Sequence, residues 1–335
     1  MASITHAQQA STFLQRLDPR PALQRSFTVN PLLTLVGLAM VFTLLGTLIG
    51  LVVDHRGITG APAWLKPTKF AISVGVYSFT LLWMLGFVKG HRRLVSLVAN
   101  VTAIGFIVEM AIIVGQVIRG TSSHFNFTTP LDGTLFAIMG IFITLVWVVT
   151  LVAAVLLLIQ GMPDPVFAWS LRLGILLSIV GMAVAFLMTQ PTAIQLAALH
   201  AGGHLSYIGA HSVGVPDGGP GLPLLGWSTV GGDLRIPHFI GLHALQVLPF
   251  VGWLLALLCP GLLRTSHRLA LLWTFGLSYL GLIALLTWQA LRGQSIIAPD
   301  ALTLRAFALL IGLTALAAIA MVTHAHMHAQ VVTAM

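Results

Sequence analysis

The chain has 335 residues, of which 57% are hydrophobic and only 7% are charged, far below the roughly 25% charged residues of a soluble domain. Its net charge of +8 comes from basic residues at the ends of apolar runs, not from a basic stripe with interleaved aromatic residues, which excludes nucleic acid as a partner. The single cysteine, Cys259, excludes an intrachain disulfide and a cysteine-ligated metal or iron–sulfur site.

The chain opens with a polar arm, residues 1–30, that carries arginines and lacks the early apolar run of a secretory signal, so we expect the first helix to remain in the mature protein. The apolar runs that follow have about 20 residues or more, enough to cross about 30 Å of hydrocarbon as helices. They lack the alternation of a barrel strand. The sequence predicts an all-α integral membrane protein in contact with the lipid bilayer, with about eight transmembrane helices, at 31–53, 68–88, 94–118, 133–159, 166–188, 236–258, 269–291 and 303–323.

An even number of spans places both chain ends on the same side of the membrane. Basic residues are concentrated in the arm and in the KGHRR segment, 89–93, after the second run. Because cytoplasmic loops are enriched in Lys and Arg, we expect both termini in the cytoplasm and the protein in the bacterial inner (plasma) membrane. The three unusual loops, 54–69, 119–133 and 189–237, then share the outer face.

Several short motifs occur twice. QVIRG (116–120) and QALRG (289–293) each close an apolar run, and KPTKF with RIPHF, and LFAIMGI with FALLIGL, repeat at nearly the same separation. We therefore predict two parallel four-helix halves, 31–159 and 166–323. Chance similarity between apolar segments is the alternative.

The second half differs from the first by its long outer loop, 189–237. The stretch PTAIQLAALHAGGH predicts a short helix that ends at the paired glycines. The Gly- and Pro-rich remainder predicts a packed lid over the outer mouth of the bundle.

Glu109 is the only acid well inside a predicted span, roughly 15 Å from its outer end. His243 and Gln246 are three residues apart and share a helical face at a similar depth. We expect Glu109, His243 and Gln246 to line one catalytic polar cavity that opens to the outer face, with Glu109 as a proton-transfer group and the histidines as bases or ligands. The alternative is that these side chains only hold helices together by hydrogen bonds.

Further histidines favour a metal or haem hypothesis. His200 and His204 have the i, i+4 spacing that places two ligands on one side of a helix. Nitrogen and oxygen ligands of this kind suit zinc, copper, iron or an axial position of haem. Hydrogen bonding of interfacial histidines to backbone is the alternative. The candidate metal ligands are His200, His204, His211, His124 and Asp233, and the candidate cofactor ligands are His238 and His243.

Two further groups have simpler interpretations. Lys66 and Lys69 flank Pro67, where anchoring at the membrane interface explains both, with binding of an anionic substrate as the alternative. The tail, 324–335, contains three histidines, and we interpret it as a solvated cytoplasmic tail rather than a metal-binding tract.

The segments EMAIIVGQVIRG, WQALRG and PHFIGLHAL resemble heme A synthase-type proteins. That family has eight spans in two four-helix repeats, with Gln-x-x-x-Gly-like ends on odd helices and histidines near the outer face, and the resemblance implies a haem held by histidines of the even helices. Here Lys69 stands where the sixth span has His238, and the fourth and eighth spans contain no histidine. The chain also resembles uncharacterised bacterial multispan membrane proteins, a resemblance that implies no activity.

These observations lead to three hypotheses of function. The first is a membrane protein with an outward-facing Glu/His cavity that binds a metal or haem for redox or cofactor-handling chemistry. The second is a transporter of a small molecule or ion whose two halves rock about the same cavity. The third is a non-catalytic assembly or sensor subunit, in which Glu109 and His243 contribute to stability alone.

Overall fold

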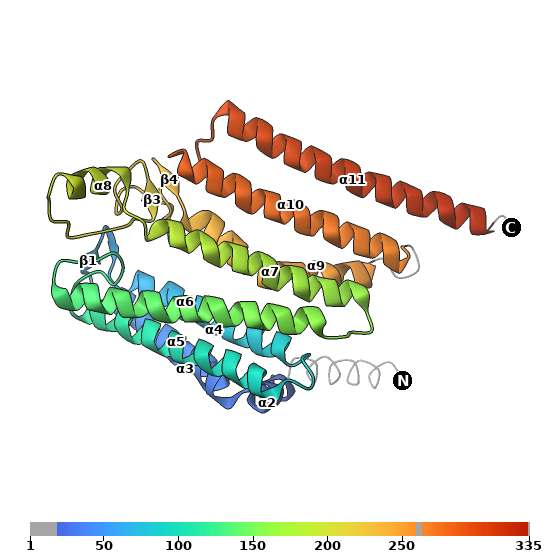
Figure 1. Ribbon diagram of the computed structural model, residues 1–335, viewed down its shortest axis with the longest axis horizontal. Helices are drawn as coiled ribbons and strands as arrows, with labels where there is room; N and C mark the ends of the chain where they lie inside the picture. The colour runs from blue at the N-terminus through green and yellow to red at the C-terminus, as the bar shows by residue number, and fades with distance from the viewer. Residues whose placement is uncertain (1–18, 259–262, 334–335) are drawn as a thin grey trace, which may run out of the picture.

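The computed structural model describes residues 19–258 and 263–333, which form a helical bundle (Figure 1). Eight described helices are long and apolar enough to cross a membrane. This result confirms the predicted all-α, multi-pass membrane fold. The eight are α3 (Pro31–Val53), α4 (Leu65–Leu85), α5 (Arg92–Ile118), α6 (Pro130–Ile159), α7 (Pro165–Met188), α9 (Arg235–Leu258), α10 (Thr265–Leu291) and α11 (Ala301–Thr333).

Three of these helices begin with the same local signal, a capping side chain followed by proline. Asn30 caps α3, Thr129 caps α6 and Asp164 caps α7, and each side chain accepts a hydrogen bond from a backbone amide of the first turn. The cap satisfies an amide that the helix start leaves free, and proline at the first position has no amide to satisfy. The starts of these three helices are therefore set by local sequence.

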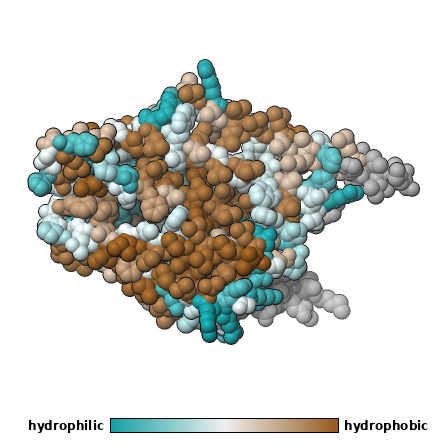
Figure 2. Space-filling view, viewed as in Figure 1, coloured by the Kyte–Doolittle hydropathy of each residue, from teal (hydrophilic) through white to brown (hydrophobic). Residues whose placement is uncertain are grey.

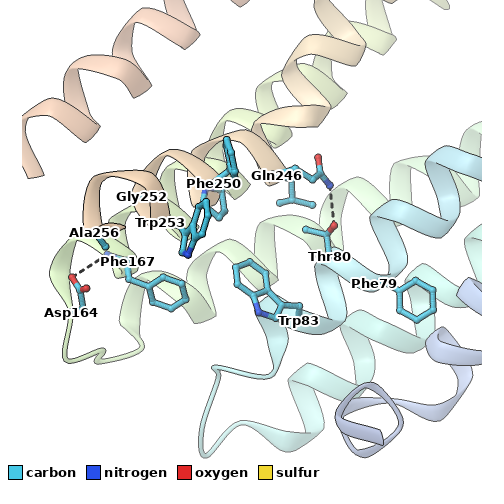
Figure 3. Close-up of a pocket in the computed structure, with 12 residues that line it drawn as sticks. Phe79, Thr80, Trp83, Asp164, Phe167, Gln246, Phe250, Gly252, Trp253 and Ala256 are labelled. Carbon is cyan, nitrogen blue, oxygen red and sulfur yellow. Dashed lines mark hydrogen bonds between the residues drawn. The ribbon is translucent and has the colours of Figure 1, made fainter. Parts of the chain in front are cut away.

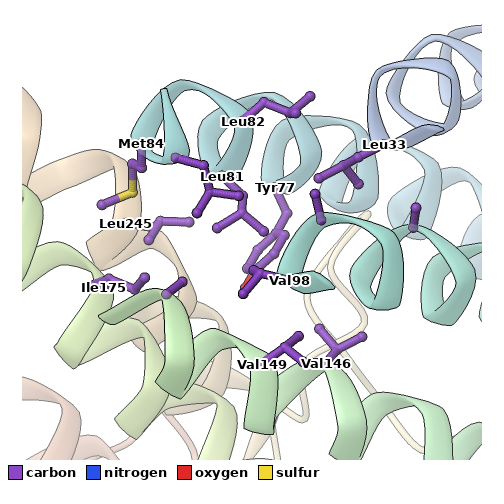
Figure 4. Close-up of a cluster of buried hydrophobic side chains, with 14 of the residues drawn as sticks. Leu33, Tyr77, Leu81, Leu82, Met84, Val98, Val146, Val149, Ile175 and Leu245 are labelled. Carbon is purple, nitrogen blue, oxygen red and sulfur yellow. The ribbon is translucent and has the colours of Figure 1, made fainter. Parts of the chain in front are cut away.

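An apolar belt crosses the middle of the bundle, and hydrophilic residues gather toward its ends, on the face that Figure 2 shows. Beneath the belt, the main hydrophobic core lies between α3, α4, α5 and α6. Ile175 of α7 and Leu245 of α9 enter the same core (Figure 4). The first and second halves of the chain are thus joined by shared packing.

Helices α7 and α9 pack closely against each other. A Cβ added at Gly181 would lie 2.5 Å from Cα of Gly241, so neither position has space for a side chain. Small residues allow two membrane helices to approach closely. This contact fixes α9 against α7.

Two corners of the bundle repeat one hydrogen-bond pattern. Nε2 of Gln116, near the end of α5, donates to the carbonyl oxygen of Ser122 at 3.4 Å, and Nε2 of Gln289, near the end of α10, donates to that of Ser295 at 3.0 Å. The QVIRG and QALRG motifs therefore make similar helix ends. The likeness is local to these corners, and duplication of the whole halves stays a prediction.

The loops 54–64, 119–129 and 189–234 lie together at one end of the bundle, on the left of Figure 1, as the even number of spans predicts. We call this end the loop end. Backbone packs closely here, because a Cβ added at Gly60 would lie 2.2 Å from the carbonyl oxygen of Gly218. The short elements of the loop end are β1 (Gly57–Ile58), β2 (Ala61–Pro62), α8 (Ala193–His200), β3 (Ser212–Val213) and β4 (Gly232–Asp233), with β1–β2 and β3–β4 paired antiparallel. The remaining short helix, α2 (Arg20–Val29), directly precedes α3.

Candidate functional site

Glu109 lies on α5, nine residues before the helix ends at Ile118, and its side chain is only 3% exposed. Its Oε1 lies 3.7 Å from Nε2 of His124. Its Oε2 is buried and has no hydrogen-bond partner among the described residues. A buried carboxyl oxygen without a partner is costly in apolar surroundings, so this position is a candidate functional site.

His124 reaches Glu109 because the loop 119–129 folds back into the bundle. Phe125 and Asn126 of this loop are buried, and Phe125 has a φ of 59°, the left-handed conformation of a tight turn. Oγ of Ser123 lies 3.0 Å from Nδ1 of His124, which leaves Nε2 directed toward Glu109. Burial, and then the positive charge of Lys66, hold the pKa of His124 well below its ordinary value, so the ring is neutral at pH 7.

His211 and Asp217, from the long loop of the second half, extend this cluster. The rings of His124 and His211 are stacked, with centroids 6.4 Å apart and an interplanar angle of 25°. Nδ1 of His211 lies 2.7 Å from Oδ2 of Asp217. Burial lowers the pKa of His211 despite this hydrogen bond, which raises it. Burial raises the pKa of Asp217, but the hydrogen bonds from His211 and Ser212 outweigh it, and the net pKa is below the ordinary range.

Lys66 also belongs to this cluster, whereas its place in the sequence predicts an anchor at the membrane interface. The ring of Phe70 lies near both Lys66 and His124, with its centroid 6.0 Å from Nζ of Lys66 and 5.9 Å from the centroid of the His124 ring. Nζ of Lys69, in contrast, donates to the carbonyl oxygen of Leu225 at 3.0 Å. Glu109, His124, His211, Asp217 and Lys66 thus form one group, which we call the acid–histidine cluster. Both halves of the chain contribute to it.

The expected cavity of Glu109, His243 and Gln246 is not what the structure shows. Nδ1 of His243, on the exposed side of α9, lies 3.3 Å from Oε1 of Gln246, and Nε2 of Gln246 donates to Oγ1 of Thr80 at 3.0 Å. These residues connect α9 to α4, whereas Glu109 faces His124. Similar depth did not determine the direction in which each side chain points around its helix.

Of the expected metal ligands, His124 and His211 lie side by side, but His200, His204 and Asp233 are not shown to join them. Helix α8 ends at His200, so His204 lies beyond the helix and does not share a face with it, because the paired glycines end the helix there. Asp233 forms an ion pair with Arg235 at 2.6 Å. His211 binds Asp217, and His124 contacts Glu109. The described residues contain no group of three or more His, Cys, Asp or Glu that could hold a metal ion.

His238, an expected cofactor ligand, makes a hydrogen bond between two membrane helices, and its role as a ligand stays a prediction. It is on α9, and its Nδ1 lies 2.8 Å from the carbonyl oxygen of Gly181 on α7. Because a carbonyl oxygen only accepts, the ring nitrogen donates this hydrogen bond. The bond supports the close contact of α7 with α9.

A groove of about 650 Å³ lies at another place, between α4, α7 and α9 (Figure 3). Its walls are mainly apolar, with five aromatic side chains among the twelve lining residues, and two of these, Trp83 and Trp253, are 44% and 53% exposed. The Gln246–Thr80 hydrogen bond lies at one end, and Asp164 is the only acid or base among the lining residues. The titratable groups gather instead at the acid–histidine cluster.

Comparison of the chain with protein-family models, with curated proteins and with solved structures gives no match. The resemblance to heme A synthase-type proteins therefore stays a prediction. The function must be inferred from the chemistry of the acid–histidine cluster.

Proposed function

We propose that this protein transfers protons at its loop end, with Glu109 exchanging a proton with His124 or with a small polar molecule bound beside it. The observation that carries the proposal is the position of Glu109, a buried carboxyl with an unpartnered Oε2 and a neutral imidazole 3.7 Å from Oε1. A small shift of either side chain, or one bridging water, would bring the pair within range for proton transfer.

The remaining residues of the cluster support this chemistry. Asp217 fixes the ring of His211 through Nδ1, which leaves Nε2 of His211 available on the other side. His211 is stacked on His124, so a proton that leaves Glu109 has a second acceptor near the first. The side chains that could carry the proton therefore run from a membrane helix to a surface loop, in the order Glu109, His124, His211 and Asp217.

The proposal retains the proton-transfer part of the sequence hypothesis and omits the metal or haem. Histidine, aspartate and glutamate side chains in the described residues do not converge on one point as metal ligands must. Proton transfer requires only an acid and a base in near contact, which Glu109 and His124 provide.

Proton-coupled transport is a second candidate, because two separate parts of the chain build the cluster. Glu109 and His124 belong to the first half, and His211 and Asp217 belong to the long loop of the second. A movement of the halves relative to one another would separate the two histidines and interrupt proton exchange.

We also propose that the loop end faces outward in a bacterial inner membrane, with both termini in the cytoplasm. The basic KGHRR segment, 89–93, lies between α4 and α5 at the opposite end of the bundle from the loop end. Positively charged loops favour the cytoplasmic side. The two four-helix halves, 31–159 and 166–323, remain part of this proposal.

The proposal can be tested on a single side chain, because Glu109 is the only glutamate in the chain. Glutamate labelled with ¹³C at the side-chain carboxyl, supplied in cell-free synthesis, gives an infrared signal from that group alone. We expect the band of the protonated acid to be gained and lost reversibly with pH and to shift in His124→Ala. The band should be unchanged in His204→Ala, a matched control at the exposed loop.

Two results would count against proton exchange at this site. One is a labelled carboxyl that keeps one protonation state across the pH range in which the protein stays folded. The other is a titration that is the same in His124→Ala as in the unaltered protein.

A further inference from the structure

We infer that the loop end binds an anionic group, a carboxylate or a phosphate, at Nζ of Lys66 beside His124 and His211. The inference rests on the proposed proton-transfer function and names the class of molecule on which it acts. The anionic group would be one part of a small polar substrate. By binding Lys66, it would hold the rest of the substrate next to Glu109.

The first observation is the pairing of the cationic side chains at the loop end. Four arginines there form ion pairs with aspartates, and Lys69 donates to a backbone carbonyl. In the part of the chain that the structure describes, Nζ of Lys66 makes no hydrogen bond and no ion pair within 4 Å. The pairs are Arg56–Asp54, Arg119–Asp132, Arg235–Asp233 and Arg292–Asp300.

The position of Lys66 in α4 adds to its positive charge. It is the second residue of the helix, where the helix dipole is positive, and no side chain caps this end. The nearest aromatic partner, the ring of Phe70, has its centroid 6.0 Å from Nζ, the outer limit of a cation–π contact. A partly buried cation without a counter-charge is costly, and a bound anion would remove that cost.

The surroundings of Lys66 match an anion reached from the loop end. The side chains of His124 and His211 are 21% and 23% exposed, so a small molecule can approach them, while Glu109 lies beneath at 3%. Nζ of Lys66 is able to donate to an anion, and so is Nε2 of His124 when Nδ1 accepts from the Ser123 hydroxyl, whereas the N–H of His211 is directed to Asp217. The unpartnered Oε2 of Glu109 is the buried group with which the substrate would exchange a proton.

This arrangement couples anion binding to protonation. An anion at Lys66 would repel an ionised Glu109 and would be compatible with a protonated one, so anion binding should raise the pH at which Glu109 loses its proton. The charged and titratable groups around the site are Lys66 and Lys69 of α4, Glu109 and Arg119 of α5, Asp132 of α6, His124, His211, Asp217 and Asp233 of the loops, and Arg235 of α9.

The test uses the single ¹³C-labelled carboxyl of Glu109 as a reporter, read by NMR of the full-length protein in detergent micelles. Inorganic phosphate and acetate are added in separate titrations, which distinguish the two kinds of anion. We expect at least one of them to shift the signal in a saturable way and to raise the pH midpoint of Glu109. Lys66→Gln should weaken this binding about tenfold or more, from the loss of one charge-assisted contact.

Two variants control for folding and for general charge effects. Lys69→Gln removes a cation from the same helix turn and should bind the anion as the unaltered protein does. Lys66→Arg keeps the charge and should restore binding. If Lys66→Gln does not fold, Lys66→Met keeps the length of the apolar stem, removes the charge and should weaken binding as Lys66→Gln does, whereas Lys69→Met should not.

The inference is overturned if neither anion shifts the signal in a saturable way, or if Lys69→Gln loses binding as strongly as Lys66→Gln. It fails separately from the proposed function. Reversible protonation of Glu109 without anion binding would overturn the inference alone, whereas Lys66-dependent binding beside a Glu109 that does not titrate would overturn proton transfer alone.

Discussion

Replacement of Asp217 by alanine should loosen the long loop and separate His211 from the acid–histidine cluster. Asp217 accepts three hydrogen bonds, from Nδ1 of His211 at 2.7 Å, from the backbone N of His211 at 3.0 Å and from that of Ser212 at 2.8 Å. Its side chain is 21% exposed, so solvent replaces these bonds only in part. We expect a local loss of about 2–3 kcal/mol, because hydrogen bonds to a charged group contribute about 1.5–3 kcal/mol each and are not additive.

Hydrogen–deuterium exchange of the two amides measures this loss directly. With about 1.4 kcal/mol for each factor of ten, the amides of His211 and Ser212 should exchange about 30- to 150-fold faster in Asp217→Ala. The pKa of Asp217 is lowered in the folded protein, so its stabilisation is complete at neutral pH and is lost as the pH falls below the ordinary aspartate range.

Asp164→Ala provides the control, because it removes a helix cap of α7 at the opposite end of the bundle. It should leave the exchange of the loop amides unchanged. Equal exchange in Asp217→Ala and in the unaltered protein would refute the role assigned to Asp217, as would an equal acceleration in Asp164→Ala.

Three further predictions concern packing, pH and metal. Gly181→Ala should lower the stability in detergent by about 1–3 kcal/mol, because its Cβ would lie 2.5 Å from the backbone of α9, while Gly115→Ala, which meets nothing within 4 Å, should not lower it. The pKa values of His124 and His211 are both lowered by burial, so their contribution to stability is complete above the ordinary histidine value and is lost as the pH falls below it. The protection of the loop amides, taken as the ratio of the intrinsic to the observed exchange rate, should therefore be lower at pH 5 than at pH 7, and an equal ratio at both pH values would contradict this. His204→Ala should leave the metal content of the purified protein unchanged, and a loss of bound metal would show that dispersed histidines do form a site.

The membrane fold was predictable because its signals lie in short stretches of continuous sequence. Apolar runs of spanning length, and caps followed by proline at Asn30, Thr129 and Asp164, are read directly from the sequence. The shared end of the three long loops follows from the number of spans. The short helix α8 was likewise expected, because the paired glycines after its apolar turns end it.

The partners of the site residues were not predictable, because sequence gives the depth of a side chain but not its direction around the bundle. Glu109 and His243 match in depth, yet Glu109 faces His124 and His243 binds Gln246. His124 reaches Glu109 through a loop that folds back, which no periodic pattern indicates. Asp217 carried a weak signal, since it is an isolated acid within the Gly- and Pro-rich stretch of the long loop.

The pairing of Glu109 with His124 is the centre of this account, and solid-state NMR tests it directly. With ¹³C in the only glutamate carboxyl and ¹⁵N in the histidine rings, a dipolar coupling reports an imidazole near Glu109. For the 3.7 Å separation of Oε1 and Nε2, we expect a coupling that disappears in His124→Ala and persists in His243→Ala. A coupling that persists in His124→Ala and disappears in His243→Ala would contradict it.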